Sequence, residues 1–464
     1  MPGSFARKPE HNLEKTINYG VDTSFLYAEL LQQYKLSGEP VDIDFRKLVN
    51  WVRLGDQYTH QIHTYPAKLL PNIAHFFVRA SAIKPTNKIV LDPFSGSGTV
   101  ALEASLAGYE PFIADANPLA LLISQVKTTA YDCDNLHQTL QKILSRFKRF
   151  RKAPEVEVVN ENIWYSPTRK KSLEILRRAI MEVECQETKN FFLVGFSAVA
   201  KKLSYADPAI SVPVRLKIKE SFTSATNKKI EKKLQWIQEA STIEEFEKIC
   251  SSNIQRVHQA NLLNPNRRKA IVVGNDARSV ERSGEKIPDA SVSMIITSPP
   301  YGSAQKYIRA SSLSLNWLEI TKPSDLSALE SRSIGREHVP ISLNQKISNE
   351  FPKEYEALLS SIKNKNPTRE RITRYYLNDM ADALSETARV LSPGGYAVFV
   401  VGNNMVCGHP LRNDKFIQQQ FLDLGLKLEL KLIDDIKSRG LMTKRNKTAS
   451  VISREVVLVF RKTP

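Results

Sequence analysis

The chain has 464 residues, 42% of them hydrophobic and 8% aromatic, which is enough for a core larger than that of one ordinary domain. Its 66 Lys and Arg residues outnumber its 49 Asp and Glu residues, and the net charge of +17 favours a polyanionic partner. Residues 1–20 are polar, and no apolar run is long enough to span a membrane. We therefore expect a cytoplasmic protein with no signal peptide and no membrane partner.

Cysteine and histidine spacing does not indicate a metal site. The four cysteines are far apart, with no Cys-x-x-Cys pair, so neither a zinc site nor a disulfide framework is expected. His60 and His63 are three residues apart, but no acidic residue or cysteine lies nearby in the sequence to complete a site. We expect a protein without bound metal.

The N-terminal part reads as mixed helical sequence. Within residues 1–57 a helical pattern starts after Thr23 and Ser24, which predicts a helical lead-in. The segment Tyr65-Pro66-Ala67-Lys68 follows, and then an amphipathic helix over residues 73–82.

A glycine-rich turn follows the first clear strand. The apolar run Ile89–Leu91 ends at Asp92 and enters Pro93-Phe94-Ser95-Gly96-Ser97-Gly98-Thr99, after which residues 100–107 read as a helix closed by Gly108. Glycines let the backbone approach a ligand, and the helix N-terminus presents unpaired N–H groups. The Gly-Lys-Ser/Thr of a phosphate loop is missing, so ATP is not expected.

Two later strands each end in an acidic residue. Residues 111–114 lead to Asp115, about twenty residues past the glycines, where an acid in a doubly wound sheet accepts hydrogen bonds from ribose hydroxyls. Residues 270–275 lead to Asp276 in the same way. Asp115 could instead cap the helix from Leu119 onwards, and its two roles could coexist, whereas Asp276 could instead only cap the segment that follows it.

Between these two acids, residues 130–265 are charged and mostly helical, with an apolar core of their own around Phe191–Phe196. Basic residues recur here in clusters: Arg146–Lys152, Arg169–Lys171, Lys228–Lys229, Lys232–Lys233 and Arg267–Lys269. Each cluster alone is most simply a solvated helix face. Together they predict an insertion that contacts nucleic acid phosphates.

The strand Val292–Ile296 ends in Thr297-Ser298-Pro299-Pro300-Tyr301-Gly302. Two prolines stop the strand and form a rigid turn that brings a hydroxyl, backbone carbonyls and an aromatic ring together. These groups suit an exocyclic nucleobase amine, whose N–H donors need acceptors and whose ring needs a stacking face.

The C-terminal part resumes the sheet. We predict a helix ending near Trp317, an irregular loop over residues 322–370 that closes over substrate, and a helix over residues 371–391. Strands are expected at residues 396–402, 428–436 and 456–461, with a basic stretch between the last two.

The motif Thr297–Tyr301 resembles the catalytic motif of DNA amino-methyltransferases, and Asp92–Thr99 resembles their S-adenosylmethionine-binding motif. The resemblance covers roughly residues 58–125 and 270–462. It implies an α/β class I S-adenosylmethionine-dependent methyltransferase, with a Rossmann-like sheet and a large, mostly helical insertion. The implied parts are a cofactor-binding half over 58–129, a DNA target recognition insertion over 130–265 and a catalytic half over 266–464.

The resemblance also assigns roles to residues. The residues expected to bind S-adenosylmethionine are Lys68, Asp92, Phe94, Gly96, Gly98, Thr99, Asp115 and Asp276, and the expected catalytic residues are Ser298, Pro299, Pro300 and Tyr301. Ser298 and the Pro299 carbonyl would accept hydrogen bonds from the amine, and Tyr301 would stack on a base rotated out of the duplex. Transfer would then be direct, without metal or covalent intermediate; no cysteine follows a proline, as the carbon-5 enzymes would require.

Serine before the two prolines is typical of cytosine-N4 enzymes, and aspartate of adenine-N6 enzymes. The expected activity is therefore methylation of cytosine N4 in double-stranded DNA, in a restriction-modification or orphan role at the nucleoid, with a cognate restriction endonuclease as a possible partner. Three alternatives stay open: an adenine-N6 DNA methyltransferase, an RNA base-amine methyltransferase, and a catalytically silent nucleic-acid adaptor.

Overall fold

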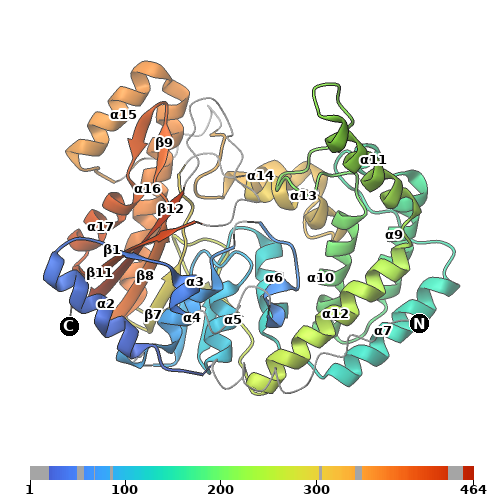
Figure 1. Ribbon diagram of the computed structural model, residues 1–464, viewed down its shortest axis with the longest axis horizontal. Coiled ribbons are helices and arrows are strands. Elements are labelled where there is room, and N and C mark those ends of the chain that lie inside the picture. Colours follow the sequence, from blue (N-terminus) through green and yellow to red (C-terminus); the bar gives the residue numbers. More distant parts are fainter. Residues whose placement is uncertain are drawn as a thin grey trace.

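The computed structural model describes residues 20–49, 57–66, 68–83, 87–302, 306–339, 347, 349–436 and 453–463. Their main feature is an eight-stranded sheet in the order β1-β11-β12-β8-β7-β2-β3-β4 (Figure 1). Its strands are β1 (Val41–Ile43), β2 (Ile89–Asp92), β3 (Glu110–Ile113), β4 (Ile271–Val272), β7 (Val292–Thr297), β8 (Leu391–Val401), β11 (Leu426–Asp435) and β12 (Arg454–Lys462).

The sheet is parallel from β4 through β3, β2 and β7 to β8. The strand β12 then runs antiparallel to both β8 and β11, and β1 lies parallel to β11 at the edge. This arrangement confirms the predicted parallel sheet and its closing antiparallel hairpin. Two short hairpins, β5 (Glu281–Arg282) with β6 (Glu285–Lys286) and β9 (Asn404–Val406) with β10 (His409–Leu411), stand apart from it.

Helices cover both faces of the sheet, which is why its strands read as continuous apolar runs. In β7, Met294 and Ile296 face one core and Ile295 faces the other. The first core is completed by α2 (Ser24–Ser37), α3 (Phe45–Leu48), α4 (Pro71–Arg79) and α5 (Thr99–Leu106). The second is completed by α15 (Lys353–Lys365), α16 (Pro367–Val390) and α17 (Asn413–Asp423).

Three helices begin with the same local signal, a polar cap followed by proline. Asn117 caps α6 (Pro118–Thr128), Ser166 caps α9 (Pro167–Met181) and Asn366 caps α16, and each side chain accepts a backbone N–H of the first turn. The missing N–H of proline costs nothing at the first helical position, since that group has no partner within the helix.

The predicted insertion is helical, and it forms the teal to yellow-green part on the right of Figure 1. Its helices are α7 (Cys133–Arg149), α8 (Glu161–Trp164), α9 (Pro167–Met181), α10 (Gln186–Lys202), α11 (Ser224–Glu239) and α12 (Thr242–Leu263). Its core continues into α6 and α13 (Tyr307–Trp317), where the buried Trp317 ring meets Tyr165 at 5.4 Å and Phe196 at 5.8 Å between centroids. The insertion therefore packs directly against elements that flank the sheet.

Two predictions about segments are corrected. The N-terminal lead-in is not only helical, because β1 extends the sheet by pairing with β11. The segment 322–370 is not an irregular loop, because it contains η4 (Pro323–Asp325), α14 (Leu326–Ser331) and α15. The buried residues Tyr355, Leu359 and Ile362 recur at helical spacing in α15, between polar residues that hid the pattern. The basic stretch predicted after residue 436 lies outside the described residues.

The remaining short helices, η2 (Tyr58–Gln61) and η3 (Ser81–Ile83), flank α4. Within the described part of the chain, no helix is long and apolar enough to cross a membrane. The same part contains no group of three or more His, Cys, Asp or Glu side chains arranged to hold a metal ion.

Candidate active site

A pocket opens where the carboxyl ends of neighbouring parallel strands meet. The strands β2 and β7 pair directly, with Leu91 opposite Ile295, so the turns that follow them lie at the same edge of the sheet. The chain continues from β2 toward β3 on one side, while β7 lies on the other, and such a switch point leaves a crevice for ligands. The pocket is lined by Tyr65, Pro93, Phe94, Gly96, Asp115, Ala116, Asn117, Asp276, Ala277, Ser298, Pro300, Tyr307, Arg332, Ser333 and Ile334.

The two glycines of the turn after β2 have different roles. Both have positive φ, +48° at Gly96 and +73° at Gly98. A Cβ on Gly98 would lie 2.5 Å from the Ser124 hydroxyl oxygen and 2.8 Å from Ser124 Cα, so this glycine lets α5 approach α6. A Cβ on Gly96 would have no neighbour closer than 3.9 Å, and Gly96 lines the pocket.

Asp115 holds the glycine turn in shape. Its two carboxylate oxygens accept the Gly96 N–H and the Asn117 N–H, each at 2.8 Å. Burial raises the pKa of Asp115 to about 6, against the lowering effect of these two N–H groups. A carboxylate has further lone pairs, so Asp115 can still accept hydroxyl donors from a ligand. The structure thus shows the local role of Asp115 in holding the turn, and its binding of ribose hydroxyls stays a prediction.

Asp92 connects the turn after β2 with the end of β7 through hydrogen bonds. Its Oδ1 accepts the Thr297 hydroxyl at 2.6 Å and the Phe94 N–H at 3.1 Å. Burial raises the pKa of Asp92 to about 7, although both hydrogen bonds lower it. The protonation state of this carboxylate therefore changes near neutral pH.

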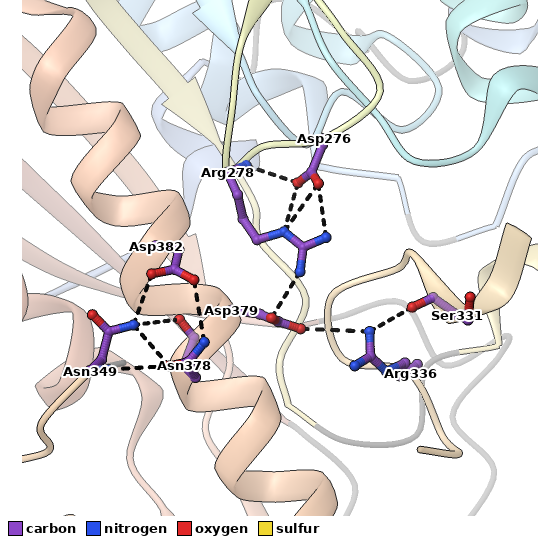
Figure 2. Close-up of polar contacts among 8 residues, drawn as sticks. All are labelled: Asp276, Arg278, Ser331, Arg336, Asn349, Asn378, Asp379 and Asp382. Atoms are coloured by element: carbon purple, nitrogen blue, oxygen red, sulfur yellow. Dashed lines mark hydrogen bonds and ion pairs between the residues drawn. The ribbon is translucent and has the colours of Figure 1, made fainter. Parts of the chain in front are cut away.

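Asp276 belongs to a charged network that reaches α16 (Figure 2). Arg278 donates to both carboxylate oxygens of Asp276 and, through Nη1, to Asp379 at 2.8 Å. On the other side of Asp379, Figure 2 shows Arg336, whose Nη1 lies 3.8 Å from that carboxylate and also donates to the Ser331 carbonyl. The network thus links the strand β4 side of the pocket with α16 and with the segment around Arg332–Ile334 that lines it.

The turn after β7 is held by its own hydrogen bonds. The Ser298 Oγ and Tyr301 hydroxyl oxygens are 3.0 Å apart, and the Tyr301 hydroxyl donates to Glu455 Oε1 at 2.9 Å. Tyr376 of α16 donates to the Pro300 carbonyl at 2.8 Å. Ser298 is partly exposed at the pocket, whereas the ring of Tyr301 is half-buried beside it.

The predicted site residues therefore fall into two groups. Six line the pocket: Phe94, Gly96, Asp115, Asp276, Ser298 and Pro300. The others are not part of its lining: Lys68, Asp92, Gly98, Thr99, Pro299 and Tyr301. Lys68 donates its ammonium hydrogens to the carbonyls of His60 and His63, at 3.2 and 2.8 Å.

Sequence reasoning did not select several lining residues. Tyr65 and Asn117 are joined at 3.0 Å through the tyrosine hydroxyl and the amide Nδ2, and Tyr307 lies at the start of α13. Tyr65 and Asn117 each lie close to a residue that was selected, so proximity to the motifs was the available signal. The segment Arg332–Ile334 carried no such signal, because it reaches the pocket from far along the chain.

The histidine pair expected not to bind metal is buried near this site. His60 Nε2 lies 2.6 Å from Glu103, and His75 contacts the other oxygen of the same carboxylate at 3.0 Å. His63 contacts the Ser197 hydroxyl at 3.1 Å, and burial lowers the pKa of His63 to about 3. These histidines therefore join η2 to α4, α5 and the insertion.

The basic clusters of the insertion divide into internal and exposed members. Arg169 donates to the carbonyls of Ile237 and Ala240 at the end of α11. Lys170 is paired with three glutamates, and the buried Arg267 donates to the Thr129 carbonyl. The exposed members, together with nearby basic residues, are Lys148, Arg149, Arg151, Lys152, Lys171, Lys217, Lys219, Lys228, Lys229, Lys232 and Arg268.

Comparison with known proteins adds independent evidence about the site. Residues 58–160, which contain the glycine turn, match the family model described as UPF0020, an RMKL-like methyltransferase domain. The Type II methyltransferase M.MvaI of Kocuria varians is 23% identical over 428 residues, which are 87% of this chain and 89% of that protein. These two similarities support a DNA methyltransferase.

A second relative of this methyltransferase is the Type II methyltransferase M.MjaII of Methanocaldococcus jannaschii. It is 31% identical over 96 residues, 21% of this chain and 18% of that protein. Among solved structures, the S-adenosyl-L-methionine complex of a DNA modification methylase from Thermus thermophilus is 20% identical and covers 38% of this chain and 50% of its own, with a TM-score of 0.18. That structural overlap is too small to support an argument.

The sheet order and the family match together make the methyltransferase a class I, S-adenosylmethionine-dependent enzyme with a Rossmann-like fold. The pocket residues fit this cofactor. Asp115 offers acceptors for hydroxyl donors, Gly96 leaves the backbone open to close approach, and the apolar groups of Phe94, Ala277 and Ile334 can flank a planar ring.

Proposed function

We propose that the methyltransferase transfers a methyl group from S-adenosylmethionine to the N4 amine of cytosine in double-stranded DNA, with the base rotated out of the duplex. The observation that carries this proposal is that Ser298 and Pro300 line the same pocket as Gly96 and Asp115. The Ser298 hydroxyl, which can accept a hydrogen bond from an amine, thus lies beside the turn that would hold the methyl donor.

Acceptors are needed because a cytosine amine is a poor nucleophile, with its lone pair delocalised into the ring. Ser298 Oγ and the Pro299 carbonyl would accept its two N–H groups and turn the lone pair toward the methyl group. When bound, S-adenosylmethionine supplies a methyl group activated by positive sulfur, and the S–C bond breaks as the N–C bond forms. The ring of Tyr301 would support the base by stacking, with Tyr307 close by in the pocket.

The cofactor would be bound by the glycine turn and the two acids. Asp115 would accept the ribose hydroxyls, and Asp276 would contact the adenine or its surroundings. Asp92, Gly98 and Thr99 would act from behind by holding the turn, since they lie outside the pocket lining. Lys68 would meet the methionine carboxylate only after releasing the two carbonyls that it contacts.

DNA as substrate is supported by the charge of +17 and by the exposed basic residues of the insertion. Changing Lys228, Lys229 and Lys232 together to serine should weaken binding of every duplex sequence and lower the salt slope by about three. Changing three exposed lysines of the sheet part, Lys35, Lys415 and Lys427, is the charge-matched control. If both triple variants lose DNA affinity equally, the insertion does not contact the DNA through these lysines.

The base assignment is the finer part of the proposal. Serine at position 298 favours cytosine N4 over adenine N6, and an RNA amine or a silent adaptor are the remaining alternatives. A restriction-modification role, with an endonuclease that cuts the same site, is supported by the similarity to the Type II methyltransferase M.MvaI. An intact Ser298 and an open pocket favour an active enzyme over an adaptor.

The test is transfer of labelled methyl from S-adenosylmethionine to mixed-sequence duplex DNA and to total RNA, followed by nucleoside digestion and mass spectrometry. We expect label in N4-methylated cytidine from DNA, and none when Ser298→Ala replaces the wild type. Label in N6-methylated adenosine would overturn the base assignment, label only in RNA would overturn the substrate, and no label would favour the adaptor.

A further inference from the structure

Three side chains from two distant parts of the chain form a continuous line of hydrogen bonds that starts at the pocket. Ser298 lies at the pocket, Tyr301 follows it in the same turn, and Glu455 reaches them from β12. The two oxygen–oxygen distances are 3.0 and 2.9 Å, both within hydrogen-bond range. No residue of β12 was expected at the site, because 154 residues separate Tyr301 from Glu455.

The direction of this line follows from counting hydrogens. An ionised carboxylate only accepts, so the single Tyr301 hydroxyl hydrogen is used toward Glu455. Tyr301 then has none to give Ser298, and the Ser298 hydroxyl must donate to the tyrosine oxygen. The lone pairs of Ser298 Oγ are thereby left toward the pocket, which is the orientation that an amine donor requires.

Glu455 lies among few compensating charges. Asp434 stands directly opposite it in the β11–β12 ladder, so two carboxylates share one region. The cation that lowers the pKa of Glu455 is Arg46 of α3, whose Nη1 lies 3.9 Å from Asp434. Burial raises the pKa of Glu455, against the lowering effects of Tyr301 and Arg46, and burial raises the pKa of Asp434 to about 6.

We propose that Glu455 accepts the proton that the amine loses during methyl transfer, through Ser298 and Tyr301. As the methylated nitrogen releases its proton to Ser298 Oγ, the Ser298 hydrogen moves to the Tyr301 oxygen and the Tyr301 hydrogen moves to Glu455. Both hydroxyl oxygens in the line give one hydrogen and take one, and Glu455 ends as a neutral acid. Glu455 is partly exposed, so the proton can then pass to water.

The pH dependence has a defined sign. The line works only while Glu455 is ionised, so the rate should fall as pH decreases through its raised pKa. The titratable and charged groups that face the line are Tyr301 and Tyr307 from the catalytic side, Asp434 from β11, and Asp44 and Arg46 from the α3 side. Of these, Asp434 also titrates on the acid side, and its protonation would lower rather than raise the pKa of Glu455.

The experiment measures the rate of a single turnover against pH, with saturating S-adenosylmethionine and an unmethylated DNA duplex that contains the site which the wild type methylates. Glu455→Gln keeps the size of the side chain and can still accept from Tyr301, but it cannot take a proton. We expect the rate of Glu455→Gln to fall on the order of 10²-fold, with cofactor affinity unchanged. The decrease of the rate at low pH, which is the acid limb of the pH–rate profile, should disappear. Tyr301→Phe, which interrupts the line at its middle, should lose the same limb.

The chain supplies a matched control. On the neighbouring strand β11, Glu429 accepts the Tyr27 hydroxyl at 2.9 Å, which is the same contact in a place remote from the pocket. Glu429→Gln should leave both the rate and its decrease at low pH unchanged. The relay would be overturned if Glu455→Gln keeps a rate within twofold of wild type, or if its rate is lowered but still decreases at low pH as in the wild type. If Glu455→Gln does not fold, a Tyr301→Phe variant whose rate still decreases at low pH would overturn the relay. The inference rests on the proposed transfer to an amine, which wild-type labelling tests separately.

Discussion

Thr297, at the end of β7, donates a hydrogen bond of 2.6 Å to Asp92, at the end of β2. Both side chains are buried, and 205 residues of chain separate them. Because Asp92 also accepts the Phe94 N–H, one carboxylate joins the turn that would bind the cofactor to the turn that carries Ser298. This contact therefore helps to fix the spacing between the two turns.

Replacing Thr297 by valine should therefore affect stability in a pH-dependent way. Valine keeps the shape but leaves Asp92 without its side-chain donor, which should cost about 1–3 kcal/mol in the free energy of unfolding. The cost should be larger at pH 8 than at pH 6, because the pKa of Asp92 is about 7 and a hydrogen bond to an ionised acceptor is stronger. Denaturant unfolding at both pH values measures this, with Thr297→Ser as the control that keeps the hydroxyl. An equal cost at the two pH values would contradict it.

The charged network around Asp276 should affect the affinity for S-adenosylmethionine. Arg278 holds the Asp276 carboxylate and is itself held by Asp379. Arg278→Gln should free Asp276 to move and raise the dissociation constant for S-adenosylmethionine about tenfold, or about 1.4 kcal/mol. Calorimetry measures this. Arg374→Gln is the control, since Arg374 lies in α16 and is paired with glutamates outside the pocket lining. A similar loss in both variants would assign the effect to general destabilisation.

The two glycines of the turn should respond differently to alanine. Gly98→Ala combines a positive φ, about 1–2 kcal/mol, with a Cβ 2.5 Å from the Ser124 hydroxyl, about 1–3 kcal/mol more. Gly96→Ala should cost only the conformational part but should weaken cofactor binding, because Gly96 lines the pocket. Thermal unfolding and calorimetry on both variants separate the two effects. The reverse order of stabilities would contradict the packing argument.

Much of the fold could be predicted from local patterns. The strands β2 and β7 are runs of apolar residues that end in a turn, so their positions and the meeting of their carboxyl ends could be expected. The edge strand β1 could not, because three residues with only one neighbouring strand carry too weak a pattern. The helix α15 was missed because its buried residues are spaced among charged ones.

The site divides in the same way. Gly96, Asp115 and Ser298 follow strand ends closely and could be selected from sequence, and the structure brings them to one pocket. Glu455 could not be selected, because its contact with Tyr301 exists only after β12 inserts between β8 and β11. Chain distance hides such partners, and no local periodicity reports them.

The affinity for S-adenosylmethionine should depend on pH through Asp115. Burial raises the pKa of this acid to about 6, so below that pH it is largely protonated in the unliganded protein. Ribose hydroxyls donate to the ionised form better than to the acid, so binding should favour ionisation. The dissociation constant for S-adenosylmethionine should therefore decrease as pH rises from about 5 to about 7 and level off above the pKa.

Calorimetric titration across this range measures the effect, and proton release on binding near the pKa of about 6 is its second sign. Asp115→Asn should bind more weakly at neutral pH and lose most of the pH dependence, because an amide does not titrate. The conservative change still accepts the Gly96 N–H through its oxygen, so the turn is retained in part. A dependence of the same slope in Asp115→Asn would move the titration to another group, of which Asp92 is the nearest in pKa.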